Sequence, residues 1–260
     1  MNTEDGHPKT NRLDRMSSTQ LAKLLTEENS VAVSAAVAAH SQIAQAIEWV
    51  AKAFRDGGRV IYVGAGTSGR IAASDAAEMP PTFGVEPGRF VALIAGAAID
   101  AAKEGAEDDT DAAHREMLAL DPKDPDLVVG ISASGRTPYV LTAIQAAHTR
   151  TIGIANNPGS PLLTISDLSV LLDTGPEVLT GSTRLKAGTA QKIALNAIST
   201  GAMILAGRVQ GNHMSHMTPT NEKLRRRAVA IVATTFDLSE DAATVRLEAA
   251  GWDLPTALKV

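Results

Sequence analysis

The sequence predicts an α/β protein in which five parallel strands form one sheet covered by helices on both faces. Five short runs rich in apolar and β-branched residues alternate with segments of helical periodicity; these runs are 59–63, 90–95, 126–132, 151–155 and 168–172. Each run is apolar throughout, which is typical of parallel strands buried on both faces. Loops rich in glycine and hydroxyl residues follow the first and third runs, which indicates a ligand site at the edge of the sheet.

The remaining elements are predicted to be helical. Residues 1–20 are polar and expected to be extended, and residues 21–54 carry a helical pattern that breaks near 27–30, where Ser30 is the expected N-cap of the second half. The helices expected next are 68–78, 99–118, 137–149 and 184–209, with short helices over 238–260. We therefore divide the chain into an N-terminal segment with helices (1–50), a central sheet domain (51–218) and a short helical C-terminal region (219–260).

The composition argues against several classes of function. The chain of 260 residues contains no cysteine, so disulfides, thiolate catalysis and Cys-ligated zinc are excluded, and His213 and His216 lack a third metal ligand nearby in sequence. A formal charge of −5 and an aromatic content of 3% argue against a nucleic-acid partner, which requires basic or stacking surfaces. The polar N-terminus lacks an apolar targeting core and no run is as long as a membrane span, so we expect a cytoplasmic protein without a membrane partner.

The first glycine-rich loop, Gly64-Ala-Gly-Thr-Ser-Gly-Arg70, joins a strand to a helix. A helix N-terminus presents unpaired N–H groups and the positive end of the helix dipole, so it suits an anion. Gly66 lets the backbone approach the ligand, and Thr67 and Ser68 add hydroxyl donors, which predicts a phosphate site. The loop also fits G-x-G-x-x-G, but the next strand lacks the acidic residue that would hold a dinucleotide ribose.

A second loop of the same kind follows the third strand and contains Ser132, Ser134, Gly135, Arg136 and Thr137. Thr137 is a suitable N-cap with a proline after it, so these hydroxyls could simply cap the next helix. In the flavodoxin-like strand order 2-1-3-4-5, however, strands one and three are neighbours on either side of the switch point. The two loops are then expected to meet there, which favours a shared phosphate site.

Two acidic segments offer candidates for acid–base chemistry. Pro80 and Pro81 are expected to end the helix over 68–78, which places Glu78 in its last turn. The negative end of the helix dipole should then favour the protonated carboxyl, as a general acid requires, although an ordinary exposed glutamate is the alternative. The run from Asp100 to Asp109 carries five acids, and the pattern leaves open which of them reaches the site.

A third hydroxyl-rich loop, 179–188, opens the long helix. Thr180, Ser182 or Thr183 could cap this helix or contact a substrate. Arg184 and Lys186 could balance the charge of an anionic ligand.

With these loops in place, the chain resembles proteins with a sugar isomerase (SIS) domain and, more narrowly, is similar to the N-acetylmuramic acid 6-phosphate etherase family of bacterial cell-wall recycling. The motifs that carry the resemblance are Gly64-Ala-Gly-Thr-Ser-Gly-Arg70, Asp75-Ala-Ala-Glu-Met-Pro-Pro-Thr-Phe-Gly84, Glu104-Gly-Ala-Glu-Asp108, Ala133-Ser-Gly-Arg-Thr-Pro-Tyr139, Leu179-Thr-Gly-Ser-Thr-Arg-Leu-Lys, Gly188-Thr-Ala-Gln-Lys192, Ile198-Ser-Thr-Gly-Ala-Met203 and Thr220-Asn-Glu-Lys-Leu224. The resemblance covers most of residues 10–230. It implies a SIS-type fold with the flavodoxin-like parallel sheet.

The resemblance also implies a carbon–oxygen lyase that cleaves the lactyl ether of a phosphosugar. It assigns the proton donor to Glu78 and the second acid/base group to Glu107, and it implies a homodimer that needs no metal or nucleotide cofactor. The expected substrate and phosphate contacts are Gly66, Thr67, Ser68, Ser132, Ser134, Gly135, Arg136, Thr137, Ser182, Thr183 and Lys186.

The chain departs from the family pattern at Ala77 and Met79, where the family commonly has Ser and Cys. The N-terminal segment is matched loosely, and Val260 falls short of the usual C-terminal helical region. Two other functions fit the same fold: a phosphosugar isomerase and a non-catalytic sugar-phosphate sensor. The presence of both Glu78 and Glu107 favours the lyase, because a pure binding protein needs neither.

Overall fold

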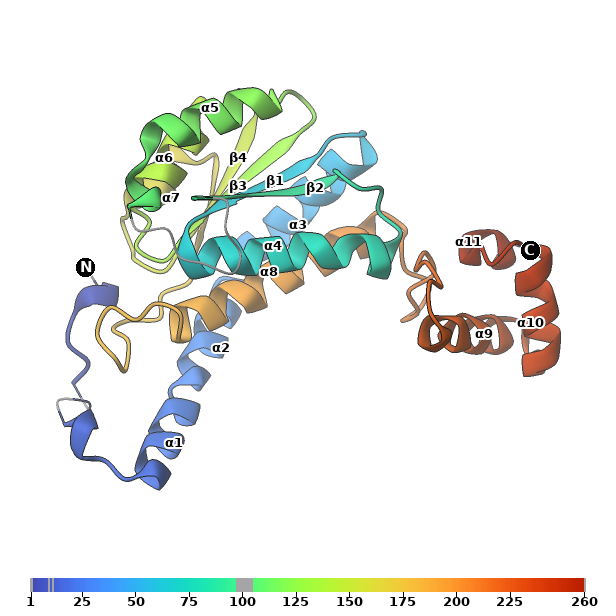
Figure 1. The fold of residues 1–260 in the computed structure, drawn as a ribbon, viewed down its shortest axis with the longest axis horizontal. Coiled ribbons are helices and arrows are strands. Elements are labelled where there is room, and N and C mark those ends of the chain that lie inside the picture. The colour runs from blue at the N-terminus through green and yellow to red at the C-terminus, as the bar shows by residue number, and fades with distance from the viewer. Residues whose placement is uncertain (1, 9, 11, 97–104, 260) are drawn as a thin grey trace.

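The five strands form one parallel sheet in the order β2-β1-β3-β4-β5 (Figure 1). They are β1 (Val60–Gly64), β2 (Phe90–Ile94), β3 (Leu127–Ser132), β4 (Arg150–Ala155) and β5 (Leu168–Leu171). The computed structural model describes residues 2–8, 10, 12–96 and 105–259. Val60 lies beside Phe90 on one side and Leu127 on the other, so β1 and β3 end at neighbouring positions. The predicted strands and their order are confirmed.

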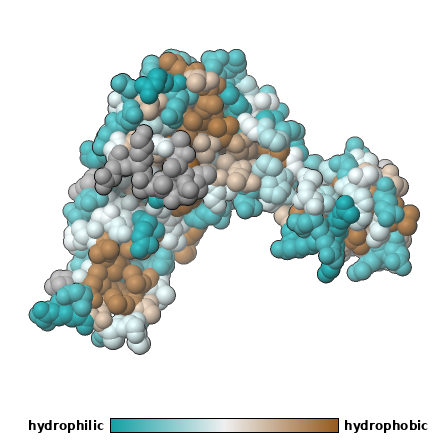
Figure 2. Space-filling view, in the orientation of Figure 1, coloured by the Kyte–Doolittle hydropathy of each residue, from teal (hydrophilic) through white to brown (hydrophobic). Residues whose placement is uncertain are grey.

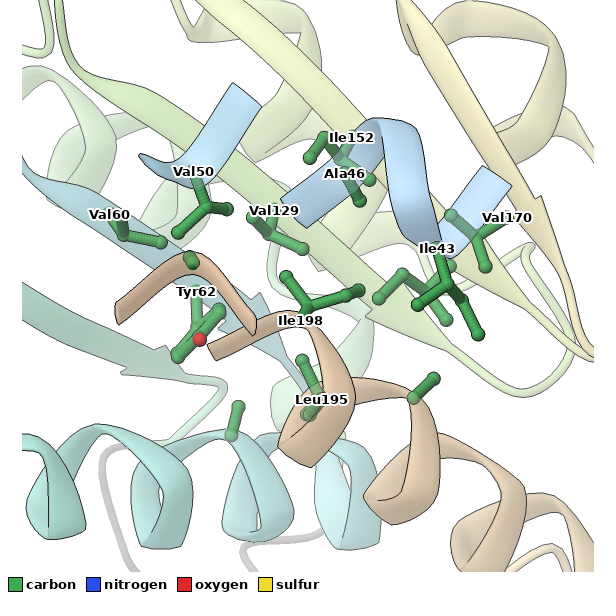
Figure 3. Packing of buried hydrophobic residues seen from close by; sticks show 14 of the residues in the cluster. Ile43, Ala46, Val50, Val60, Tyr62, Val129, Ile152, Val170, Leu195 and Ile198 are labelled. Carbon is green, nitrogen blue, oxygen red and sulfur yellow. The ribbon is translucent and has the colours of Figure 1, made fainter. Parts of the chain in front are cut away.

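Successive strand residues face opposite sides of the sheet, and each side is covered by helices. Tyr62 and Val129 face α3 (His40–Arg55), α4 (Gly66–Phe83) and α8 (Lys186–Leu205), as Figure 3 shows for α3 and α8. Ile61, Val63 and Val128 face the other layer, which consists of α5 (Thr110–Leu120), α6 (Pro138–Ala146) and α7 (Pro161–Ile165). Two apolar cores therefore hold the sheet from both faces, as expected for strands that are apolar throughout.

The scarcity of aromatic residues is compensated by close helix packing through small side chains. Ala46 on α3 and Ala194 and Ala202 on α8 are fully buried. A Cβ at Gly201 would lie 2.6 Å from the Ile47 side chain, so the two helices approach each other more closely there than alanine would allow. Alanine-rich surfaces let helix backbones approach closely, and this packing fixes α8 against the sheet.

The helix α4 continues through Pro80 and Pro81 and ends at Phe83, so the predicted stop before the prolines is wrong. Met79 and Phe83 are buried on this helix, and their burial offsets much of the cost of the two interior prolines, which is roughly 3 kcal/mol each. Gly84 ends the helix in the left-handed region (φ +59°), where a Cβ would lie 2.2 Å from a backbone oxygen. Glu78 is therefore in the interior of α4 and not in its last turn.

The N-terminal segment is helical from Ser18, earlier than expected, and two short 3₁₀ turns, η1 (Asn2–Glu4) and η2 (Leu13–Arg15), replace the extended chain predicted for 1–20. The break near residue 28 separates α1 (Ser18–Glu27) from α2 (Asn29–Ala38) as predicted. The expected N-cap is wrong: Ser30 lies inside α2 and its hydroxyl donates to the carbonyl of Glu27. Figure 1 shows α1 and α2 projecting from the body as an arm.

Within the described residues, no single helix is long and apolar enough to cross a membrane. Two consecutive helical segments, 18–38 and 40–55, are long and apolar enough for a membrane span only when taken together, and the chain bends by 62° between them.

The C-terminal helices form a small unit set apart from the sheet (Figure 1). They are α9 (Glu222–Phe236), α10 (Glu240–Ala249) and α11 (Leu254–Ala257), and they enclose an apolar cluster of their own. The Arg225 guanidinium lies 5.0 Å from the centre of the Trp252 ring, which ties α9 to the turn before α11. The basic run 223–227 lies on α9 with its charged residues exposed.

Candidate active site

A cavity of about 260 Å³ lies at the edge of the sheet where β1 and β3 end. It is lined by Ala65, Gly66, Thr67 and Ser68 at the start of α4, by Ser132, Ala133, Ser134 and Thr137 between β3 and α6, by Gly181 and Thr183 before α8, and by Glu4 and Glu107. The two loops that the strand order brings together therefore line one cavity. Their roles in ligand binding stay predictions.

The start of α4 presents backbone donors to this cavity. Its N-cap is Ala65, which has no side chain to accept a hydrogen bond from the first turn. The N–H groups of Gly66, Thr67 and Ser68 have no carbonyl partner within the helix, so they are suited to an anion. Gly64 has a packing role, because a Cβ there would lie 2.7 Å from the backbone nitrogen of Gly69.

The Ser68 hydroxyl is part of a buried polar network. It donates to Gln191 Oε1 at 2.8 Å, and the Gln191 amide donates to Asn156 Oδ1 at 2.9 Å. The Asn156 amide in turn donates to the carbonyl of Leu172. The network joins α4, α8 and the ends of β4 and β5, so the Ser68 proton is already engaged. Only the backbone N–H of this residue remains as a donor toward the cavity.

The loop between β3 and α6 is held by its own hydroxyls. Ser132 Oγ lies 2.8 Å from Thr137 Oγ1 and 3.3 Å from Ser134 Oγ, and it accepts from the Gly135 N–H at 3.1 Å. Thr137 occupies the N-cap position of α6 but makes no side-chain cap hydrogen bond, so capping does not explain its hydroxyl. Arg136 is exposed, and neither it nor Gly135 is among the described residues that line the cavity.

Gly135 is required by backbone conformation and by packing. Its φ is +62°, and a Cβ there would lie 2.2 Å from Ser160 Oγ, which is a buried hydroxyl without a hydrogen-bond partner among the described residues. The glycine thus allows the loop to pack against the start of α7.

The loop before α8 is anchored by Glu177, a residue that the sequence analysis did not identify. This fully buried carboxylate accepts hydrogen bonds from the N–H groups of Lys186 at 3.1 Å and Ala187 at 2.9 Å. Burial raises the pKa of Glu177 despite these hydrogen bonds. Thr180, Ser182 and Thr183 therefore do not cap α8, which begins two residues later than predicted.

Lys186 lies outside the described lining of the cavity and forms a buried ion pair. Its Nζ is 3.0 Å from Glu28 Oε2, and His7 Nε2 is 3.2 Å from the same oxygen. Burial alone would raise the pKa of Glu28, but the hydrogen bond and charge of Lys186, assisted by His7, hold it below its ordinary value. The lysine thus connects α8 to the arm, which does not support its predicted contact with substrate. Ser182 also lies outside the described lining.

The structure places the two candidate glutamates differently. Glu107, in the 3₁₀ turn η3 (Ala106–Asp108), lines the cavity. Glu78 is exposed and lies eleven residues beyond Thr67, which is about 16 Å along α4 at a rise of about 1.5 Å per residue. A single chain therefore does not bring Glu78 to this cavity. Asp100 and Glu104, two other acids of the same run, lie outside the described residues.

One turn before Glu78, α4 carries a buried carboxylate. Asp75 accepts hydrogen bonds from the hydroxyls of Tyr62 at 2.9 Å and Ser199 at 3.0 Å. Burial raises its pKa. Together with the burial of Met79, these contacts fix the rotation of α4 about its axis, and Glu78 is exposed beside them. Within the described part of the chain, no group of three or more His, Asp or Glu side chains is placed to hold a metal ion.

Comparisons with known proteins agree on the family and the fold. The sequence matches the family model described as "SIS domain" over residues 104–201 and the model "Glucokinase regulatory protein N-terminal SIS domain" over residues 42–148. Curated proteins named N-acetylmuramic acid 6-phosphate etherase are similar along nearly the whole chain. The protein from Geobacillus thermodenitrificans is 46% identical over 98% of this chain and 88% of its own length, and the one from Salmonella typhi is 42% identical over 98% and 88%.

Solved structures show the same fold at lower identity. A phosphoheptose isomerase from Neisseria gonorrhoeae has a TM-score of 0.53 and 22% identity, over 73% of this chain and 98% of that one. A phosphoheptose isomerase from Francisella tularensis has a TM-score of 0.52 and 19% identity, over 74% and 100%. The parallel five-stranded sheet with helices on both faces is thus a SIS-type fold.

Proposed function

This chain belongs to the N-acetylmuramic acid 6-phosphate etherase family, and we propose that it cleaves the D-lactyl ether of N-acetylmuramic acid 6-phosphate. The products are N-acetylglucosamine 6-phosphate and D-lactate, formed in the recycling of cell-wall sugar. One observation carries the proposal: proteins named for this activity are 41–46% identical to the chain over nearly its full length. A cytoplasmic location, expected from the polar N-terminus, is part of the same proposal.

The chemistry is an elimination followed by a hydration. In the open-chain sugar, the C1 aldehyde acidifies the proton on C2, and a base removes this proton. The C3–O bond then breaks, the double bond forms between C2 and C3, and the departing lactate oxygen receives a proton from an acid. Water adds at C3 and a proton returns to C2. Glu107, which lines the cavity, is suited to the C2 proton transfers, and Glu78 is the proposed proton donor.

The phosphate is proposed to bind at the start of α4. The N–H groups of Gly66, Thr67 and Ser68, together with the hydroxyls of Thr67 and Ser134, supply donors without requiring a cation. The hydroxyl network of Ser132 and Thr137 supports this arrangement, because it holds the second loop in place before ligand binds.

We infer further that the enzyme works as a homodimer in which Glu78 acts on substrate bound by the partner copy. Thr67 and Glu78 are roughly 16 Å apart along α4. A phosphosugar whose phosphate binds at Thr67 is too short to reach Glu78 of the same chain, which supports this inference. The arm supports it as well: α1 has no buried residue, and Leu25, Val33 and Val37 are 40%, 52% and 65% exposed. Figure 2 shows an apolar patch on the arm. Exposed apolar side chains of this kind favour contact with a second copy.

The proposed function is tested by incubating the purified, chelator-treated protein with N-acetylmuramic acid 6-phosphate and assaying D-lactate. We expect stoichiometric release of D-lactate and N-acetylglucosamine 6-phosphate. Aldose–ketose interconversion of a phosphosugar without lactate release would contradict the etherase and indicate an isomerase. Tight phosphosugar binding with no reaction would instead indicate a sensor.

A further inference from the structure

The first residues of the chain are fastened beside the cavity by a reciprocal pair of hydrogen bonds. The backbone N–H of Thr3 donates to Asn157 Oδ1 at 3.1 Å, and the Asn157 amide donates to Thr3 Oγ1 at 3.0 Å. Thr3 is 0% exposed and Asn157 is 3% exposed. This buried pair joins residues 154 positions apart and fixes the N-terminal segment to the loop that follows β4. Figure 1 shows η1 next to the loop that precedes α8.

This attachment places Glu4 in the wall of the cavity. Glu4 lines the cavity together with Glu107, Thr183 and Gly181. A Cβ at Gly181 would lie 2.9 Å from Glu4 Oε2, so the Glu4 carboxylate lies directly against the backbone of Gly181, whose φ of +73° favours glycine. The side chain remains accessible to solvent and hence to a ligand in the cavity.

The chemistry of a carboxylate decides which part of a phosphosugar it can meet. An ionised carboxylate only accepts hydrogen bonds and repels a phosphate, whereas sugar hydroxyls and an acetamido N–H are donors. The donors suited to phosphate come from the α4 start and the 132–137 loop, and Glu4 lies against the third wall, at Gly181. If the phosphate binds to the α4 start and the 132–137 loop, the sugar is the part of the substrate that faces Glu4.

We propose that Glu4 is a substrate-binding residue that accepts a hydrogen bond from a hydroxyl or the acetamido N–H of the sugar, and that Thr3 and Asn157 position it. This inference rests on the proposed etherase function. It adds the N-terminal segment to the site, and it gives Glu4 a part in selecting a phosphosugar over a bare anion.

The test compares two ligands on the full chain: N-acetylglucosamine 6-phosphate and inorganic phosphate, titrated by calorimetry. We expect Glu4→Gln to weaken the binding of the phosphosugar about tenfold, which is the effect of one hydrogen bond to a charged acceptor. The affinity for inorganic phosphate should remain unchanged. Asp14→Asn is the matched control, since it removes an exposed carboxylate of the same segment that does not line the cavity. Thr3→Val should weaken the phosphosugar less, and its effect should largely vanish in the Glu4→Gln background.

Three results would overturn the inference. No change with either ligand would remove Glu4 from the site. If both ligands bind more tightly by the same factor, Glu4 acts only through charge repulsion. If both bind more weakly by the same factor, Glu4 only shapes the cavity. Lactate release by the unmodified protein is assayed in parallel. If Glu4→Gln has no selective effect on phosphosugar affinity but the unmodified protein releases lactate, this inference alone is overturned. If the unmodified protein releases no lactate, the proposed etherase function is overturned.

Discussion

Replacing Glu177 with alanine should loosen the third wall of the cavity while the sheet remains folded. The carboxylate accepts hydrogen bonds from the N–H groups of Lys186 and Ala187, and both groups lie at the buried start of α8. Without an acceptor, each N–H loses its partner in a place that water does not reach. The loop that carries Gly181 and Thr183 runs between Glu177 and this helix start, so it loses its anchor.

The expected cost follows from the two hydrogen bonds. A buried donor left without a partner costs about 1–3 kcal/mol, so two of them predict a loss of about 3 kcal/mol in the free energy of unfolding. Glu177→Gln keeps one acceptor oxygen but turns an NH₂ group toward the second N–H, and we expect a loss of about 1–2 kcal/mol.

The two substitutions also separate the charge of Glu177 from its hydrogen bonds. Burial raises the pKa of Glu177 above its ordinary value of 4.5, so the folded protein binds more protons than the unfolded chain in the pH window just above 4.5. The contribution of Glu177 to stability is therefore greatest at low pH and falls as pH rises through that window. The stability difference between the original protein and Glu177→Gln should shrink accordingly.

Urea unfolding of the three proteins between pH 4 and 8 provides the assay. A stability difference between the original protein and Glu177→Gln that grows with pH would refute the raised pKa. A loss below about 0.5 kcal/mol in Glu177→Ala would refute the claim that this carboxylate anchors α8.

Three further substitutions test the site. Glu78→Gln should abolish D-lactate release and leave phosphosugar affinity nearly unchanged; joint loss of both would mean that Glu78 is structural. Ser134→Ala should weaken the binding of N-acetylglucosamine 6-phosphate about tenfold and leave the binding of the unphosphorylated sugar unchanged. Equal effects on the two affinities would exclude Ser134 from the phosphate site. Gly135→Ala should lower the free energy of unfolding by about 2–3 kcal/mol, more than Gly159→Ala. Both glycines have positive φ, but a Cβ at Gly135 would lie 2.2 Å from Ser160 Oγ, whereas a Cβ at Gly159 would meet no described atom beyond its chain neighbours within 4 Å. Equal losses for the two glycines would contradict the packing argument.

The sheet could be predicted from the sequence because its signal is local. Each strand is a continuous apolar run bounded by loops. The observed β1 is shifted by one residue at each end from the prediction, and the observed β3 begins one residue later and ends at the predicted residue. The strand order then follows from general rules of α/β topology, and it correctly brings the loops after β1 and β3 to one cavity.

The parts that could not be predicted depend on contacts between distant residues. The sequence does not show that Met79 and Phe83 are buried on α4, and this burial favours continuation of the helix through Pro80 and Pro81 against the local preference of proline. Lys186 resembles a phosphate ligand in the sequence, but Glu28, 158 positions earlier, already binds its ammonium group. Glu4 stands in a polar N-terminus with no periodicity, and the pairing of Thr3 with Asn157, 154 positions away, holds it at the cavity.

The position of an oxygen label tests the central claim most directly. The reaction is run on N-acetylmuramic acid 6-phosphate in ¹⁸O-labelled water, and both products are analysed by mass spectrometry. Elimination and hydration break the C3–O bond, so the label should enter N-acetylglucosamine 6-phosphate at C3 and the D-lactate should carry none. Label in the lactate, or no lactate at all, would contradict the proposed reaction.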